Sequence, residues 1–267
     1  MAKAIKLGVF LWFGYRIPIP ERVRIIRETG FETVLHWWDD SFIEVEGFTR
    51  EEQAGLIRDA GLSIENAHLQ YDQVNNIWLD TNDGKAIFER YLSDIDGLAK
   101  YEIPVAVFHH SSGNTPPPIS DIGMYRFQKL VERGEKRGVR IAVENVRNPH
   151  ILNHILDEIN SPMLGLCYDS GHDLIWSPRP YELLDKYSDR IFAVHLHDNM
   201  GHDDDHLAPG TGKINWDIVL AGIARSSYVG SYTLESDSQE IPPSRTPQEH
   251  LKMHFESVAV LTKKWEV

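Results

Sequence analysis

The chain has 267 residues, a length that suits one large α/β domain or two small ones, and its composition is that of an ordinary globular protein. Its formal net charge of −13 argues against nucleic acid as a partner, because such binding depends on basic contacts to phosphate. No apolar run approaches the ~18 residues of a membrane span. The single cysteine, Cys167, excludes an intrachain disulfide and favours a reducing, cytoplasmic location.

Short apolar runs rich in β-branched residues alternate along the chain with amphipathic stretches. The runs predict eight strands, at 5–11, 33–37, 62–68, 104–109, 140–144, 164–169, 191–195 and 231–235. The stretches between and after them predict helices near 20–29, 50–60, 84–101, 121–137, 150–159, 179–188, 216–225 and 247–264. Gly30, Gly61 and Gly138 stand where helix C-termini favour a residue tolerant of positive φ, and Pro20 suits a first helical turn.

Eight alternating strand and helix units predict a parallel sheet, because each right-handed crossover returns the chain to the same sheet. A doubly wound open sheet would normally carry a glycine-rich turn after its first strand, whereas residues 11–15 read Leu-Trp-Phe-Gly-Tyr. We therefore predict a closed (β/α)₈ TIM barrel. No composition shift marks a linker, so we expect residues 1–267 to form one domain.

The ends of successive predicted strands carry side chains of the kinds that bind metal ions. They are His68, His109, Glu144, Asp169, His195 and Glu235. In a barrel these ends surround one mouth, where barrel enzymes place their chemistry. Acidic and imidazole groups converging there would repel one another or stay unsatisfied without a cation. The pattern therefore predicts a divalent metal centre.

Three motifs accompany these strand ends. Residues 167–172 read Cys-Tyr-Asp-Ser-Gly-His, which we interpret as Asp169 and His172 facing one centre across a Ser-Gly turn. Residues 195–198 read His-Leu-His-Asp, and strand alternation places His195 and His197 on the same side. Residues 204–212 form a polar loop that contains Asp204 and His206 and ends in a turn rich in Pro and Gly.

Other features of the chain fit ordinary structural roles. A lone histidine is more often a hydrogen-bonded core or surface residue than a ligand, and we place seven in that class: His36, His110, His150, His154, His202, His250 and His254. A solvated acidic loop is the alternative interpretation of the run 203–205, which contains the candidate Asp204. We interpret Cys167 as strand packing.

These motifs resemble the xylose isomerase-like barrels, which include sugar isomerases, ketose 3-epimerases, inosose-processing enzymes and endonuclease IV. The most specific parts are Val-Glu-Asn at 143–145, Tyr-Asp-Ser-Gly-His at 168–172, His-Leu-His-Asp at 195–198 and Asp-x-His-x-x-Pro-Gly-x-Gly at 204–212. The resemblance implies a metal held by Glu144, Asp169, His195 and Glu235, with His172 contacting substrate. The ion is expected to be Mn²⁺, Zn²⁺, Mg²⁺ or Co²⁺.

The resemblance also implies that Glu144 and Glu235 move protons. A divalent ion stabilises an enediolate, and carboxylates on its two faces can remove and return a proton. We therefore predict an isomerase or epimerase of carbohydrate metabolism, and which glutamate acts first stays open.

A zinc phosphodiesterase like endonuclease IV is an alternative to the isomerase. The resemblance matches all of that enzyme's zinc-ligand positions to residues of this chain, namely the four ligand residues above and five more. These are His68, His109, His172, Asp204 and His206, which would raise the number of ions from one to three or would bind substrate. An inosose-type dehydratase and a non-catalytic sugar-binding barrel are further alternatives. Acidic loops at 199–205 and 236–240 disfavour DNA and phosphorylated sugars. We expect a small neutral sugar or polyol, contacted by Trp12, Trp38, Asn75 and Asn76, and a possible homo-oligomer.

Overall fold

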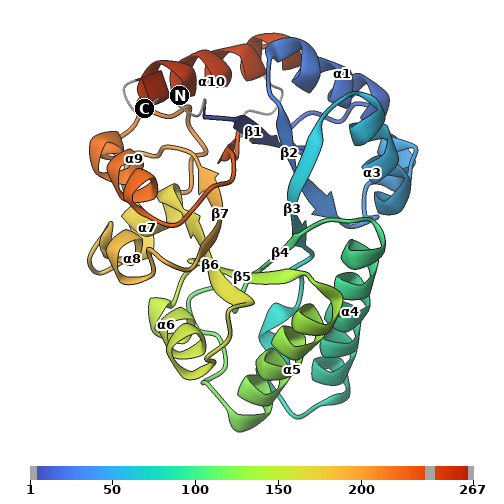
Figure 1. The fold of residues 1–267 in the computed structure, drawn as a ribbon, viewed down its shortest axis with the longest axis vertical. Coiled ribbons are helices and arrows are strands. Elements are labelled where there is room, and N and C mark those ends of the chain that lie inside the picture. Colours follow the sequence, from blue (N-terminus) through green and yellow to red (C-terminus); the bar gives the residue numbers. More distant parts are fainter. Residues whose placement is uncertain (1–4, 238–243, 264–267) are drawn as a thin grey trace.

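The computed structural model describes residues 5–237 and 244–263. Its eight strands are all parallel and close into a barrel in the order β1-β2-β3-β4-β5-β6-β7-β8. Figure 1 shows the strands as a central ring with helices outside it. The predicted (β/α)₈ barrel is thus confirmed.

No strand end differs from its predicted position by more than two residues. The strands are β1 Leu7–Phe10, β2 Thr33–Trp38, β3 Ser63–Leu69, β4 Val105–Phe108, β5 Arg140–Glu144, β6 Leu164–Asp169, β7 Ile191–Leu196 and β8 Tyr232–Leu234. β8 pairs with both β7 and β1, which closes the ring. The predicted strand ends therefore do meet at one mouth.

The long helices also follow the prediction, and most have readable ends. They are α1 Ile19–Thr29, α3 Arg50–Asp59, α4 Asn82–Lys100, α5 Asp121–Arg137, α6 Pro149–Glu158, α9 Trp216–Arg225 and α10 Pro247–Thr262. Gly30 and Gly138 cap α1 and α5 at φ of 112° and 74°. Position 264 of the predicted last helix lies outside the described residues.

Four shorter elements depart from the prediction. α8 Glu182–Lys186 is shorter than the stretch 179–188, and α2 Ile43–Glu46 and η1 Val74–Trp78 lie outside the predicted helices. α7 Ser170–Trp176 begins directly after β6, where we predicted a turn. Asp169 is its N-cap residue, and the Asp169 Oδ1 atom accepts the backbone N–H of His172 at 2.7 Å. The two side chains are therefore placed by a helix N-terminus.

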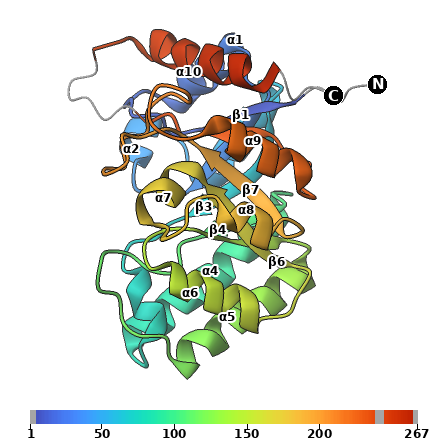
Figure 2. The same cartoon turned by 90° about the vertical axis from the view of Figure 1, so that its left-hand side faces the viewer.

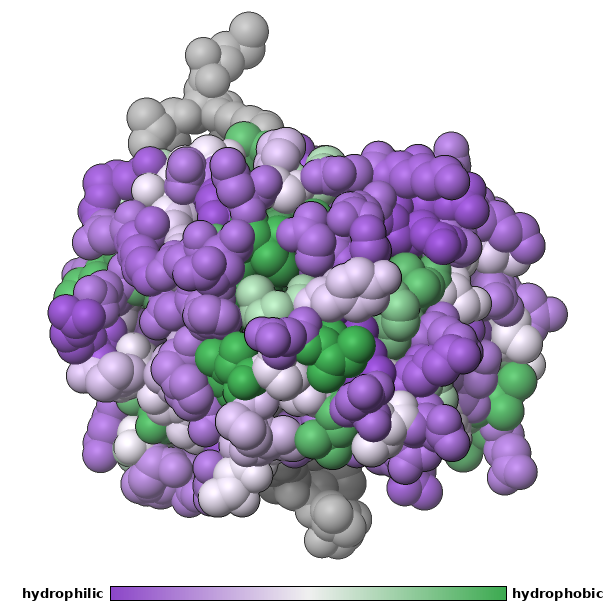
Figure 3. All heavy atoms as spheres, turned by 90° about the horizontal axis from the view of Figure 1, so that it is seen from below, coloured by the Kyte–Doolittle hydropathy of each residue, from purple (hydrophilic) through white to green (hydrophobic). Residues whose placement is uncertain are grey.

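The core has two layers. The larger lies between the strands and the surrounding helices, and the smaller fills the barrel with Val105, Val107, Ala142, Cys167 and Ala193. Figure 2 shows α4, α5 and α6 on one flank of the barrel and α1 and α10 on the other. Figure 3 shows hydrophobic residues in small groups among hydrophilic ones on the outer face. None of the helices in residues 5–237 and 244–263 is long and apolar enough to span a membrane.

Candidate metal centre

A cavity of about 400 Å³ opens where the strands end. Aromatic side chains form part of its wall, namely Phe10, Trp12, Trp37, Phe42 and Tyr71. Carboxylates and imidazoles form the rest together with a few smaller polar residues, and they include His68, His109, Glu144, His172, Asp204, His206, Glu235 and Asp237. The cavity thus combines an apolar surface with a dense set of ligand-type groups.

The four residues predicted to hold the metal come together beneath this cavity. The Nδ1 atom of His195 lies 2.9 Å from Oε1 of Glu235 and 3.4 Å from Oε2 of Glu144. Ligand atoms of Asp169, His195 and Glu235 lie within 4.8 Å of one another. All four residues are buried. His195 of β7 thus lies beside both Glu144 of β5 and the group that Asp169 of β6 and Glu235 form with it.

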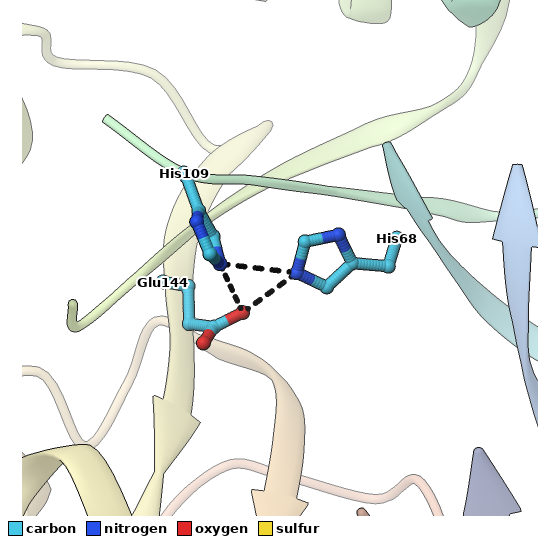
Figure 4. A group of neighbouring side chains, drawn as sticks. All are labelled: His68, His109 and Glu144. Carbon is cyan, nitrogen blue, oxygen red and sulfur yellow. Dashed lines mark hydrogen bonds and ion pairs between the residues drawn. The ribbon is translucent and has the colours of Figure 1, made fainter. Parts of the chain in front are cut away.

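A second group lies at the neighbouring strand ends, with His68 from β3, His109 after β4 and Glu144 from β5. Figure 4 shows both imidazoles turned towards the same carboxylate. The Nε2 atom of His68 lies 3.1 Å from Oε2 of Glu144 and 3.2 Å from Nε2 of His109. The His109 Nε2 atom lies 3.6 Å from the same oxygen. Glu144 therefore belongs to both groups.

A third group extends from Glu144 towards the loop after β7. His172 lies between two carboxylates, with its Nδ1 atom 2.9 Å from Glu144 Oε1 and its Nε2 atom 3.2 Å from Asp204 Oδ2. The Nε2 atom of His206 lies 3.5 Å from the same Asp204 oxygen. All nine ligand-type residues named from the sequence thus lie around one site.

His197 is a site residue that the sequence left ambiguous. Its Nε2 atom lies 3.1 and 3.2 Å from the two oxygens of Asp169, and its ring stacks on His206 at 4.1 Å. It is fully buried. The alternation that places it on the side of His195 was the available signal, but spacing alone could not tell a ligand from a residue that orients one.

The two glutamates of the site stay ionised despite their burial. Burial would raise the pKa of Glu144, but the adjacent His109, His172 and His195 hold it well below its usual range. Burial likewise opposes ionisation of Glu235, yet nearby imidazoles, chiefly that of His195, lower its pKa to about 2. These carboxylates are therefore anionic donors at neutral pH.

This donor set fits a divalent cation. Buried carboxylates need a positive partner, and protonated histidines supply it when no ion is bound. Burial would lower the pKa of His206, but Asp204 raises it to about 9. Mixed oxygen and nitrogen donors suit several divalent ions. Glu144, Asp169, His195 and Glu235 would hold such an ion, with any further ion falling to the outer groups.

The predicted substrate contacts need correction. Trp12 lines the cavity and stacks on Phe42 with ring centroids 5.0 Å apart. Trp38 does not, because it is fully buried against α4, where the missing Cβ of Gly97 leaves room for its ring. The neighbouring Trp37 lines the cavity instead.

Asn75 and Asn76, which belong to η1, also lie outside the cavity lining. The amide of Asn75 exchanges two hydrogen bonds of 2.9 Å with the backbone of Ser112, so it is committed to holding a loop. The seven histidines assigned ordinary structural roles are all described, and none of them lines the cavity.

Comparison with known proteins agrees with this fold. The family model described as xylose isomerase-like TIM barrel matches residues 23–257. The chain therefore belongs to the xylose isomerase-like TIM barrel family.

Two curated relatives match over shorter segments. An uncharacterized protein of Sinorhizobium fredii is 36% identical over 99 residues, which are 35% of this chain and 32% of that protein. Inosose dehydratase 1 of Bacillus cereus is 25% identical over 137 residues, which are 43% of this chain and 45% of that protein. The chain thus matches less than half the length of either relative.

Solved structures match over almost the whole chain. L-ribulose 3-epimerase superposes with a TM-score of 0.76 and 16% identity, covering 98% of this chain and 96% of that one. The IolI protein with a bound zinc atom superposes with a TM-score of 0.79 and 16% identity, covering 98% and 99%. At such identities the likeness shows the shared fold.

Proposed function

We propose that this chain is a metal-dependent isomerase or epimerase of a small, non-phosphorylated sugar or polyol. The observation that carries the proposal is the placement of Glu144 and Glu235 around one imidazole nitrogen at the floor of the cavity. Epimerases and an inosose dehydratase among its relatives support chemistry on a sugar.

The two glutamates would exchange a proton with the substrate. One carboxylate would remove the proton from a carbon next to a carbonyl group, and the other, after taking up a proton from solvent, would donate it to the resulting enediolate. A divalent ion held beside them would polarise the carbonyl and hydroxyl oxygens of the sugar. His172 contacts Glu144 directly and is placed to hold that carboxylate in position.

The charge of the cavity supports a neutral substrate. Among the residues that the structure describes, neither lysine nor arginine lines it, whereas Asp72 and Asp237 add carboxylates to its wall. A phosphate group would meet repulsion without a compensating cation. Aromatic side chains of the same cavity wall can instead pack against the apolar face of a sugar ring.

Two alternatives have support of their own. The relationship to inosose dehydratase 1 favours loss of water from a ketone substrate, a reaction that begins with the same proton abstraction. The several groups of ligand-type side chains at the barrel mouth favour a zinc phosphodiesterase, although the acidic wall opposes a DNA backbone.

Assays of the purified protein separate these reactions. The protein would be stripped with chelator, reloaded with Mn²⁺, Co²⁺, Zn²⁺ or Mg²⁺, and incubated with ketoses in D₂O. An epimerase incorporates solvent deuterium at one carbon, a dehydratase forms an unsaturated or deoxy product, and a phosphodiesterase nicks an abasic duplex. Turnover only in the last assay would overturn the proposal.

Substitutions test the assignment of the two glutamates. We expect Glu144→Gln and Glu235→Gln each to abolish turnover and to leave sugar binding detectable. Glu65→Gln is a matched control, because Glu65 lies on β3 far from the strand ends that hold the metal ligands. Its carboxylate accepts a hydrogen bond from the backbone N–H of Ser231, which precedes β8. Full activity in both cavity variants would contradict the proton-transfer roles.

A further inference from the structure

We propose that Cys167, Glu144 and His195 form a second, deeper ligand set that binds a thiophilic divalent ion through sulfur, nitrogen and oxygen. Ligand atoms of these three residues lie within 4.8 Å of one another, and all three side chains are buried. The set shares Glu144 and His195 with the centre described above, and Cys167 takes the place of Asp169 and Glu235.

The β-strand pattern explains why Cys167 reaches this position. Cys167 and Asp169 are two residues apart on β6, so their side chains point to the same side of the sheet. Cys167 also packs with Ala142 of β5 and Ala193 of β7 in the small core that fills the barrel. The thiol therefore lies in the barrel interior, one layer below Asp169.

His195 supplies an independent sign of a missing ligand. It is fully buried, and its Nδ1 atom lies near both glutamates. Neither of its ring nitrogens has a hydrogen bond of ordinary geometry among the residues that the structure describes, and the thiol of Cys167 interacts with the ring. Buried polar atoms without partners are rare in folded proteins and call for an ion, a water molecule or a functional role.

The chemistry of the three donors selects the class of ion. Thiolate ligands favour soft and borderline ions such as Zn²⁺, Cd²⁺ and Co²⁺, whereas Mg²⁺ and Mn²⁺ prefer oxygen donors. Cys167 supplies the sulfur donor that sets this preference. Binding breaks the S–H bond, forms a metal–sulfur bond and releases one proton to solvent.

Cadmium is the probe that tests this ligand set, because a thiolate bound to Cd²⁺ gives an ultraviolet charge-transfer band. Cys167 is the only cysteine of the 267 residues, so such a band has one possible source. We expect the wild-type protein, stripped of metal and titrated with Cd²⁺, to develop the band in proportion to the first equivalent bound. Stoichiometric binding without the band, or no binding, would overturn the proposal.

Two variants locate the ion within the barrel. Cys167→Ser should lose the band and bind Cd²⁺ more weakly by about tenfold or more. Glu235→Gln is the matched control, because it removes a carboxylate from the upper centre only, and we expect it to keep the band. Should Cys167→Ser fail to fold, the wild-type titration alone still decides.

The inference shares residues with the proposed function but does not depend on its reaction. The cadmium spectrum uses no sugar, and the isomerase assay uses wild-type protein loaded with Mn²⁺. A protein that epimerises a ketose without a cadmium band would refute only the deeper set. A band without turnover on any sugar would refute only the proposed reaction.

Discussion

Gly171 provides a sharp test of how the metal centre is held in place. It is the second residue of α7, and a methyl group at this position would lie 2.0 Å from Cε1 of His197. The ring would have to move by more than 1 Å to reach an ordinary contact distance, which begins near 3.4 Å. His197 is fully buried, stacked on His206 and bonded to Asp169, so it cannot move away freely.

These contacts set the size of the effect expected for Gly171→Ala. Overpacking a buried site costs about 1–3 kcal/mol, and the better helix propensity of alanine offsets up to about 1 kcal/mol. We expect a net loss of about 1–2 kcal/mol in the free energy of unfolding. Because His197 orients Asp169, Mn²⁺ affinity should also fall by about tenfold or more.

Urea unfolding and calorimetric titration with Mn²⁺ measure the two quantities. Gly55→Ala is the matched control, since Gly55 lies within α3 and a methyl group there would meet no atom within 4 Å. That variant should gain up to about 1 kcal/mol and bind Mn²⁺ normally. A Gly171→Ala protein as stable as the wild type, with unchanged affinity, would refute the role assigned to His197.

Three further predictions concern stability. Asp198→Ala should lower the free energy of unfolding, measured in urea, by about 3 kcal/mol or more, because its buried carboxylate accepts hydrogen bonds from three backbone N–H groups and from the indole of Trp216. Trp216→Phe removes only one of these bonds and should cost about 1 kcal/mol. Burial lowers the pKa of His36 from 6.5 to about 4, so as pH falls below 6.5 the unfolded chain takes up the proton first and stability is lost. His36→Gln should therefore reduce the loss measured between pH 7 and 5 by about 2 kcal/mol. Removal of bound metal with a chelator should lower the melting temperature. Adding the ion back at 100 times its Kd should raise the free energy of unfolding by about 2.7 kcal/mol. An unchanged melting temperature would argue against the metal centre.

The alternation of strands and helices was readable from the sequence because each unit buries its own apolar surface. β5 and β6 begin and end where predicted, since their apolar runs stop at the carboxylates Glu144 and Asp169. The strand-end positions then followed from the topology, because parallel strands of a barrel all end at one rim. Pattern and topology were thus enough to bring together the six strand-end residues, whereas the full set of nine, with Asp204 and His206 from the loop after β7, was implied by the family resemblance.

The details that depend on a single-residue choice could not be read in the same way. Trp37 and Trp38 are adjacent and both aromatic, so composition does not say which faces the cavity. His36 and Trp38 share the outer side of β2, where His36 bonds the backbone of Arg50 and Trp38 packs on α4. The residues after Asp169, where we predicted a turn, form helix α7 because the aspartate caps its N-terminus. The same carboxylate also fits a metal ligand, so the sequence alone did not reveal the helix.

Glu144 and His195 belong to more than one group of ligand-type side chains. Glu144 contacts His68, His109, His172 and His195, so any ion that binds it alters the partners of four imidazoles at once. The proposed deeper set would share Glu144 and His195 with the proposed upper centre, so an ion bound by one set would compete with an ion bound by the other. If the proposed turnover with Mn²⁺ is observed, its dependence on added Cd²⁺ tests whether the two ligand sets compete.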